Sequence, residues 1–214
     1  SKGAKCAVSI TPANTKRLAP LAEEAGADVI VVQSTVTTAR HYSKSARGLV
    51  FSEFLETVSV PVIVGNCVAY DVALELMETG IDGVLVGVGP GAACTTREVT
   101  GVGVPQVTAT MDCAAAREEY FRRTSKYVPI ITDGGIRTGG DLCKAFASGA
   151  DAVMIGTPLA QSEEAPGNGF NWGMASPHAS LPRGVRVSVG VKGSLDKILF
   201  GPTSKTDGTQ NLIG

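Results

Sequence analysis

A cysteine lies on a glycine-rich loop near the middle of the chain, in the stretch Gly87-Val88-Gly89-Pro90-Gly91-Ala92-Ala93-Cys94-Thr95-Thr96. Cys94 stands outside the apolar periodicity of its surroundings, among backbone amides that can favour a thiolate. Thr95 and Thr96 follow it directly, and their hydroxyls can hydrogen-bond a nucleophile or a water molecule. These residue types predict that Cys94 is a catalytic nucleophile.

The other four cysteines, Cys6, Cys67, Cys113 and Cys143, fall at predicted strand ends or on helix faces. We therefore expect them to be small buried hydrophobic residues. The five cysteines are widely spaced and lack a CxxC pair or a companion histidine cluster, which argues against a disulfide framework and a zinc site. This usage fits a reducing compartment, either the cytoplasm or the plastid stroma.

Two further glycine loops, Asp133-Gly134-Gly135-Ile136 and Gly156-Thr157, each follow a predicted strand. In a parallel barrel they are neighbours, and backbone N–H groups there can approach a phosphate next to a helix N-terminus. Asp133 is placed to accept hydrogen bonds from sugar hydroxyls, unless it is only a turn aspartate. The two loops favour a nucleoside monophosphate. A phosphosugar isomerase would share this phosphate cradle but would leave the Cys94 loop unexplained.

A pattern of helix, glycine and apolar strand occurs three times, around Gly26, Gly80 and Gly149. Amphipathic helices are expected at 14–24, 69–79 and 139–148, each ending before its glycine. The predicted strands are 6–10, 29–32, 60–64, 83–88, 128–132 and 152–155.

Most of these strands are apolar on both faces, which predicts a parallel sheet covered by helices. The residues with chemistry follow strands, and this favours a (β/α)8 TIM barrel over an open doubly wound sheet. Only about six β/α units are found where a barrel has eight. We therefore expect residues 1–214 to be the C-terminal three-quarters of one catalytic barrel, without its first two units and extreme C-terminus. Two open sheet edges would leave such a piece prone to aggregation and inactive on its own.

The composition excludes several classes of partner. Nineteen Lys and Arg residues against twenty Asp and Glu residues give a net charge of -1, so no basic field attracts nucleic acid or anionic lipid. The longest apolar run is far shorter than the roughly 20 residues of a membrane span. We expect a small-molecule ligand, with no nucleic acid and no membrane.

The motifs together resemble the inosine monophosphate (IMP) dehydrogenase and guanosine monophosphate (GMP) reductase family. The resemblance is carried by GPGAACTTREVTGVGVPQ, by TDGGIRTGGDLCKAFASGADAVMIGTPLA, by SEEAPG and by the Trp-Gly-Met-Ala-Ser stretch at 172–176. It covers nearly the whole chain from about Lys5. The C-terminal part looks most like the dehydrogenase-related, GMP reductase-like subgroup.

The resemblance implies that Cys94 attacks C2 of the purine and that Thr96 assists the leaving group or a water molecule. It implies that Asp133 binds the ribose hydroxyls. Substrate-binding positions would also include Gly134, with Gly135, Gly156 and Thr157 for the phosphate and Gly173, Met174 and Ala175 for the purine edge. Asn66, Gly87 and Gly89 match positions near the cofactor, NADPH or NAD. Carbonyls of Gly89, Gly91 and Cys94 match a monovalent cation site, which K⁺ would fill.

The chain also departs from the family pattern. Where the dehydrogenases have an aspartate and a basic residue, it has Gln33 and Leu85. The Arg-Tyr flap that activates water in the dehydrogenases has no counterpart between Gly173 and Gly193. No acidic residue at 188–192 matches the glutamate of the reductases.

These departures favour reduction of GMP to IMP and ammonia with NADPH, because this reaction needs no hydrolytic flap. The alternative is oxidation of IMP to XMP with NAD, which uses the same cysteine adduct. A hypothesis of another class is a noncatalytic subunit, or a fragment whose barrel a partner chain completes. By resemblance we expect a homotetramer.

Overall fold

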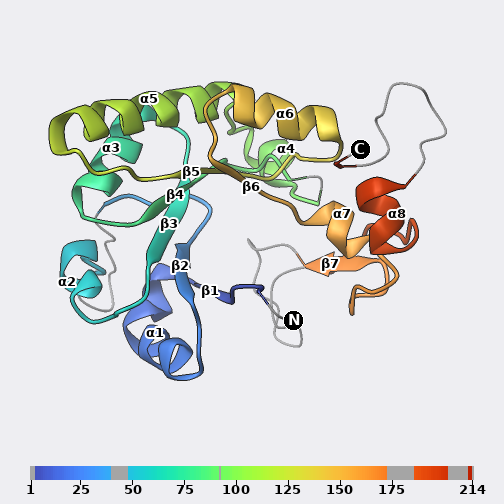
Figure 1. Cartoon of the computed structure of the whole chain (residues 1–214), viewed down its shortest axis with the longest axis horizontal. Coiled ribbons are helices and arrows are strands. Elements are labelled where there is room, and N and C mark those ends of the chain that lie inside the picture. Colours follow the sequence, from blue (N-terminus) through green and yellow to red (C-terminus); the bar gives the residue numbers. More distant parts are fainter. Residues whose placement is uncertain (1–2, 40–47, 92, 173–185, 202–211, 214) are drawn as a thin grey trace.

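Six parallel strands form one sheet, in which each strand pairs with the next along the chain. The computed structural model describes residues 3–39, 48–91, 93–172, 186–201 and 212–213. The strands are β1 (Ala7–Ile10), β2 (Val29–Gln33), β3 (Val62–Cys67), β4 (Gly83–Val86), β5 (Ile130–Asp133) and β6 (Ala152–Met154). The sheet curls, with helices on its outside (Figure 1). An open doubly wound sheet would reverse its strand order, so this sequential order confirms a partial (β/α)8 barrel.

Helices follow the strands in alternation. They are η1 (Pro12–Asn14), α1 (Thr15–Glu24), α2 (Phe51–Leu55), α3 (Tyr70–Glu78), α4 (Thr96–Thr100), α5 (Gln106–Thr124), α6 (Gly139–Ala147), α7 (Thr157–Ala160) and α8 (Leu195–Phe200). A separate antiparallel pair joins β7 (Phe170–Trp172) to β8 (Arg186–Ser188). The 19-residue α5 is absent from the sequence-based expectation. Its buried face consists largely of small residues such as Ala109, Cys113 and Ala116, which give a weak apolar periodicity.

Two strands begin later than expected because a proline precedes each of them. β3 starts at Val62 after Pro61, and β5 starts at Ile130 after Pro129. Proline has no N–H for the sheet ladder, so it sits before the strand. β3 also continues to Cys67, and β5 includes Asp133. Asn66 and Asp133 therefore belong to strand ends rather than to the loops after them.

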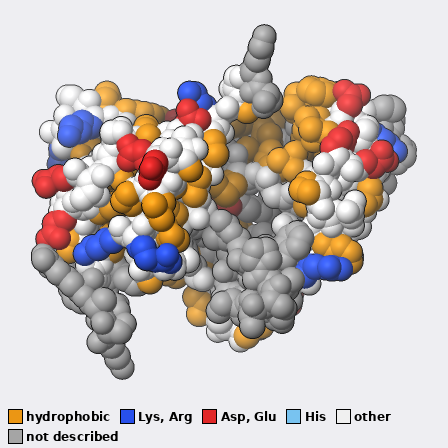
Figure 2. Space-filling view, turned by 90° about the horizontal axis from the view of Figure 1, so that it is seen from below, with side chains coloured by type: hydrophobic (Ala, Val, Ile, Leu, Met, Phe, Trp, Pro, Cys, Tyr) orange, Lys and Arg blue, Asp and Glu red, His pale blue; other side chains and the backbone are white. Residues whose placement is uncertain are grey.

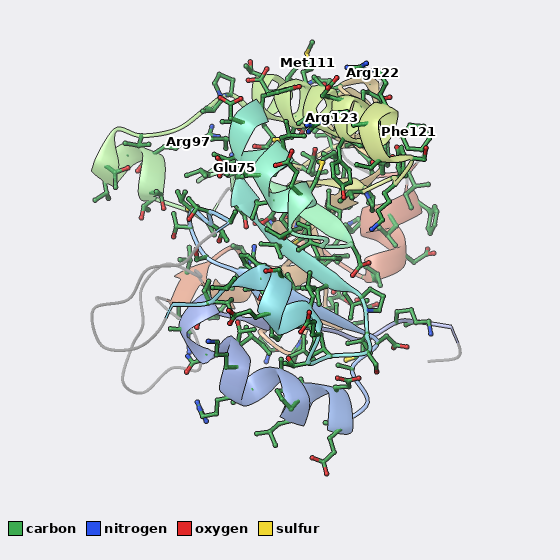
Figure 3. The ribbon with its side chains drawn as sticks, turned by 90° about the vertical axis from the view of Figure 1, so that its left-hand side faces the viewer. Glu75, Arg97, Met111, Phe121, Arg122 and Arg123 are labelled. Atoms are coloured by element: carbon green, nitrogen blue, oxygen red, sulfur yellow. The ribbon has the colours of Figure 1, made fainter. Side chains whose placement is uncertain are left out.

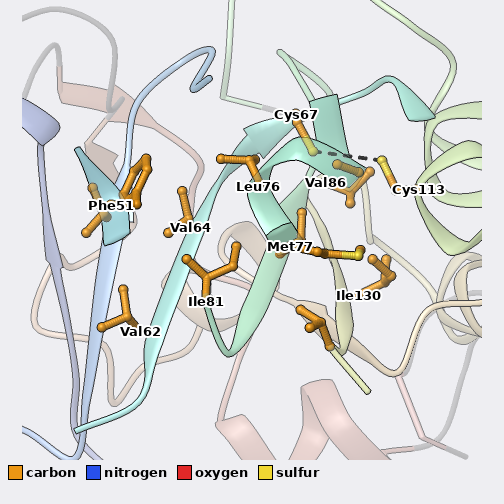
Figure 4. Close-up of a cluster of buried hydrophobic side chains, with 14 of the residues drawn as sticks. Phe51, Val62, Val64, Cys67, Leu76, Met77, Ile81, Val86, Cys113 and Ile130 are labelled. Atoms are coloured by element: carbon orange, nitrogen blue, oxygen red, sulfur yellow. Dashed lines mark hydrogen bonds between the residues drawn. The ribbon is translucent and has the colours of Figure 1, made fainter. Parts of the chain in front are cut away.

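Burial on both faces holds for the centre of the sheet but not for its edges. Val62, Val64 and Val86 are fully buried in the core (Figure 4), and so is Val84. In contrast, β6 has two exposed residues and β1 has one. Each of these outer strands pairs with a single neighbour in the described sheet, so less of its surface is covered.

The prediction that four cysteines are buried is correct for two of them. Cys67 at the end of β3 and Cys113 on α5 are buried with their sulfurs 3.8 Å apart (Figure 4). Cys6 and Cys143 are exposed, and the prediction was wrong there. Cys6 precedes the edge strand β1, and Cys143 lies on the outer side of α6.

The surface seen in Figure 2 carries charges of both signs among its apolar side chains, rather than a field of one sign. Among the described residues, no helix is long and apolar enough to cross a membrane.

The guanidinium of Arg117 ties α5 to the turn that precedes β6. Its Nη1 donates to the carbonyl oxygen of Gly149 at 2.9 Å and to Oδ2 of Asp151 at 2.6 Å. The same Asp151 oxygen accepts the N–H of Ile130 at 2.8 Å, and the Tyr127 ring lies 5.0 Å from the guanidinium carbon. Only 9% of the Arg117 side chain is exposed, so this ion pair is weakly screened by solvent.

We predict that Arg117→Met lowers the free energy of unfolding by about 2–3 kcal/mol, because it removes the charged donor to Asp151 and to the carbonyl of Gly149. Arg122→Met is the matched control on the same helix, since the Arg122 side chain is 74% exposed and pairs with Glu119 one turn earlier. That control should cost less than about 1 kcal/mol. Equal losses in chemical denaturation would contradict the structural role of Arg117.

Candidate functional site

The Cys94 thiol is half-buried, and its Sγ lies 3.2 Å from Oγ1 of Thr96. The backbone N–H of Cys94 donates to the carbonyl oxygen of Gly91 at 3.0 Å, which closes a turn beneath the thiol. Thr96 is the first residue of α4. The structure thus places the two predicted catalytic residues in direct contact, with Thr95 exposed beside them.

Arg97 holds the two ends of the Cys94 loop together, a role that sequence reasoning missed. Its Nε donates to the carbonyl oxygen of Val88 at 3.0 Å, and its Nη2 donates to that of Val104 at 2.6 Å. Arg97 is the second residue of α4, and Figure 3 shows it away from the labelled residues of α5. A Cβ on Gly103 would lie 2.7 Å from the Arg97 side chain, so a glycine is needed there. The glycines around Cys94 therefore serve the packing of this arginine as well as tight turns.

The Gly134-Gly135 turn packs directly against the Cys94 loop. Both glycines have positive φ, +89° and +81°, which other residues rarely adopt. A Cβ on Gly134 would lie 3.0 Å from Pro90 and 3.1 Å from the nitrogen of Gly91. Two predicted loops, 43 positions apart at Gly91 and Gly134, therefore meet through glycine backbone.

Asp133 precedes this turn, and two amide side chains hold its carboxylate. Nδ2 of Asn66 donates to Oδ2 of Asp133 at 2.8 Å, and Nε2 of Gln33 donates to the same oxygen at 3.0 Å. Gln33 Nε2 also donates to Oδ1 of Asn66 at 2.9 Å. Burial raises the pKa of Asp133, against the opposing effect of the two amide donors. The strands β2, β3 and β5 thus place three polar groups at one edge of the sheet.

Gly87 and Gln106 form the support behind Asp133. Gly87 has φ +136°, and a Cβ on it would lie 2.6 Å from the carbonyl oxygen of Asp133. Nε2 of Gln106, the first residue of α5, donates to the carbonyl oxygen of Val86 at 2.6 Å. The Oε1 of Gln106 is buried without a hydrogen-bond partner among the described residues. Gln106 was not predicted, because nothing in its local sequence distinguishes it from a surface glutamine.

One glycine of the predicted phosphate-binding loops, Gly156, has room for a side chain. Gly156 has a negative φ of -111°, and the nearest atom to a Cβ there is 3.9 Å away. Neither strain nor crowding therefore requires a glycine at this position. Gly173, Met174 and Ala175 lie outside the described residues.

The helix ends near the cradle contribute less positive potential than expected. α6 begins with a capping box in which the side chains of Thr138 and Asp141 satisfy each other's backbone N–H groups. Asp141 also places a negative charge in the first turn of that helix. α7 is a single turn. A phosphate would therefore depend mainly on the loop backbone at Gly135 and Gly156.

Comparison with known proteins agrees with this arrangement. Residues 3–176 match the model of the IMP dehydrogenase / GMP reductase domain. The chain belongs to the IMP dehydrogenase/GMP reductase family.

Three similar proteins illustrate the family. An uncharacterized oxidoreductase of Mycolicibacterium smegmatis is 44% identical over 99% of this chain and 58% of that protein. The inosine-5'-monophosphate dehydrogenase of Aquifex aeolicus is 51% identical over 67% of this chain and 27% of that protein. The crystal structure of an IMP dehydrogenase/GMP reductase-like protein from Corynebacterium glutamicum has a TM-score of 0.82 at 40% identity, covering 98% of this chain and 55% of the other. The chain thus spans little more than half the length of the first and third of these proteins.

The family positions expected to face a cofactor make internal contacts in this chain. Asn66 is buried and bonded to Asp133, Gly87 supports the backbone of Asp133, and a Cβ on Gly89 would lie 3.0 Å from the Arg97 side chain. The Gly91 carbonyl expected to ligate K⁺ already accepts the Cys94 N–H. Among the described residues, no group of three or more His, Cys, Asp or Glu side chains could hold a metal ion.

We predict that Asp133→Asn becomes more stable relative to the wild type as pH rises. Burial raises the pKa of Asp133 above its ordinary value near 3.8, so the folded chain binds this proton more tightly than the unfolded chain. The free energy of unfolding therefore falls as pH rises through the folded pKa, and Asn cannot ionise. Denaturant titrations from pH 4 to pH 8 measure this difference.

Asp141→Asn is a control for which we expect the opposite change in relative stability with pH. Burial alone would raise the pKa of Asp141, but bonds from Lys144, the Arg137 N–H and Thr138 bring it below its ordinary value. The wild type should therefore gain stability over Asp141→Asn as pH rises. If Asp133→Asn instead kept a constant stability difference from wild type at every pH, the raised pKa of Asp133 would be disproved.

Proposed function

We propose that this protein reduces GMP to IMP and ammonia with NADPH. The observation that carries the proposal is the contact of the Cys94 thiol with the Thr96 hydroxyl at 3.2 Å, on a loop packed against the Asp133 turn. Membership of the IMP dehydrogenase/GMP reductase family supports chemistry at C2 of a purine nucleotide. Reduction is favoured because the sequence offers no Arg-Tyr flap to hydrolyse a cysteine adduct.

In the first step, the sulfur of Cys94 forms a bond to C2 of guanine, and the bond from C2 to the amino nitrogen breaks. The thiol proton leaves with that nitrogen, so the products are a cysteine adduct of the purine and neutral ammonia. Thr96 Oγ1 is close enough to the sulfur to pass this proton on. Half-burial of Cys94 restricts the access of water to the adduct.

NADPH, when bound, supplies the hydride that replaces sulfur at C2. Cys94 then leaves as a thiolate and takes up one proton from solvent, which gives IMP and restores the thiol. The sum is GMP, NADPH and one proton converted to IMP, NADP⁺ and ammonia. Asp133 would accept the ribose hydroxyls, while the backbone at Gly135, Gly156 and Thr157 would bind the phosphate.

Oxidation of IMP to XMP with NAD is the second candidate, since it proceeds through the same adduct on Cys94. Assays of both reactions with the complete natural protein distinguish the two candidates. We expect it to consume NADPH with GMP and release ammonia, and to form no NADH with IMP. XMP formation from IMP and NAD would reject the reductase. No turnover in either direction would favour a noncatalytic chain, or a barrel that needs a partner chain to complete it.

We predict that Cys94→Ala lowers the rate by about 10⁴-fold or more while GMP still binds, because the proposed ribose and phosphate contacts lie on other loops. Thr96→Val should lower kcat by about a hundredfold, through loss of proton transfer, with little change in GMP affinity. Thr95→Val is the matched control, because Thr95 is exposed and its side chain caps no N–H of α4. Equal effects of the two valine substitutions would remove Thr96 from the mechanism.

A further inference from the structure

Gln33 is a glutamine at the end of β2 whose amide has a defined orientation. Its Oε1 accepts a hydrogen bond from the hydroxyl of Ser9 at 3.2 Å. Its Nε2 faces two acceptors, Oδ1 of Asn66 at 2.9 Å and Oδ2 of Asp133 at 3.0 Å. A donor on one side and two acceptors on the other leave one consistent placement of the amide oxygen and nitrogen.

The two amides bind the same oxygen of the Asp133 carboxylate. Asn66 and Gln33 both donate to Oδ2, and among the described residues no hydrogen bond reaches Oδ1. A carboxylate has about four acceptor positions, two on each oxygen. Oδ2 is therefore filled, while Oδ1 keeps two positions. The two vicinal hydroxyls of a ribose require two acceptor positions.

The charge of the site makes the neutrality of Gln33 important. Among the described residues, no ion pair compensates Asp133, and its neighbours on β2 and β3 are both amides. A second carboxylate 3.0 Å from Asp133 would force the pair to share one proton at neutral pH. The glutamine stabilises the ionised form of Asp133 without adding a charge.

We propose that Gln33 is a positioning residue for the ribose of the bound nucleotide, holding Asp133 ionised and turned so that Oδ1 receives both hydroxyls. This inference rests on the proposed function, because it takes a purine ribonucleotide as the ligand. Gln33 itself lies behind the carboxylate and does not touch the ribose. Its substitution should therefore change the recognition of the hydroxyls rather than binding in general.

The test compares the affinity of the complete protein for GMP with its affinity for 2',3'-dideoxy-GMP, by calorimetry from pH 5 to pH 8.5. The ratio of the two affinities reports the hydroxyl contacts alone. In the wild type we expect a preference for GMP that is lost at low pH, when Asp133 takes up a proton. Gln33→Met, which keeps the size of the side chain, should reduce the preference at pH 8 by about ten- to a hundredfold. The pH at which the preference disappears should also rise.

Gln33→Glu provides a second test that does not depend on the loss of the amide. It should lack the preference at pH 8 and recover part of it on acidification, when one of the two carboxyls is protonated and can donate to the other. In an Asp133→Asn background, Gln33→Met should change the ratio no further.

An unchanged ratio in Gln33→Met, or an equal loss of affinity for both nucleotides, would overturn the inference, because a purely structural role predicts either result. Failure of the wild type to bind GMP would overturn it together with the proposed function. Binding with the expected ratios but without reduction of GMP would reject the reductase and leave the role of Gln33 established.

Discussion

The carboxylate of Asp133 is half-buried, and among the described residues no cation pairs with it. The arrangement of the site follows from the need to keep this carboxylate hydrogen-bonded. Its two amide donors come from different strands, Gln33 from β2 and Asn66 from β3, while Asp133 itself ends β5. Such a contact has to pass the end of β4. It can do so because Gly87, which follows β4, has no side chain to occupy the space beside Asp133. Parallel strands in sequential order bring these ends to one edge, so the contacts of Asp133 depend on the barrel topology.

Cys94, the proposed nucleophile, is positioned indirectly, through backbone rather than through side chains of the sheet. Gly134 packs on Pro90, and Arg97 ties Val88 to Val104, so the Cys94 loop is fixed at its base and at both of its ends. Only the contact between Cys94 and Thr96 involves reactive side chains directly. The proposed nucleotide-binding residues and the proposed nucleophile therefore lie on separate loops. The loops can act together because glycines allow them to approach within van der Waals distance.

Sequence reasoning found the residues whose chemistry is visible in their type and setting. Cys94, Thr96, Asp133 and the barrel strands were identifiable because a cysteine among glycines and an aspartate after an apolar strand are locally unusual. The same reasoning did not assign structural roles in the site to Gln33, Arg97 and Gln106. Each of them forms a hydrogen bond to a partner 9 to 100 positions away in the sequence. The α5 helix was missed because it packs through alanine and cysteine. Register and packing distances, which decide these cases, cannot be read from one sequence.

The two departures from the family pattern, Gln33 and Leu85, are related by the register of the sheet. Gln33 pairs with Gly65 on β3, and Gly65 pairs in turn with Leu85 on β4. The two positions therefore share one row across three strands, with a glycine between them whose Cβ would lie 2.4 Å from that of Leu85. An acid at 33 and a base at 85 could compensate each other along such a row, but either alone would be a poorly solvated charge. Leu85 is fully buried and uncharged, so a carboxylate at position 33 would have no basic side chain in this row to compensate it. A neutral amide satisfies this constraint and still donates to Asp133.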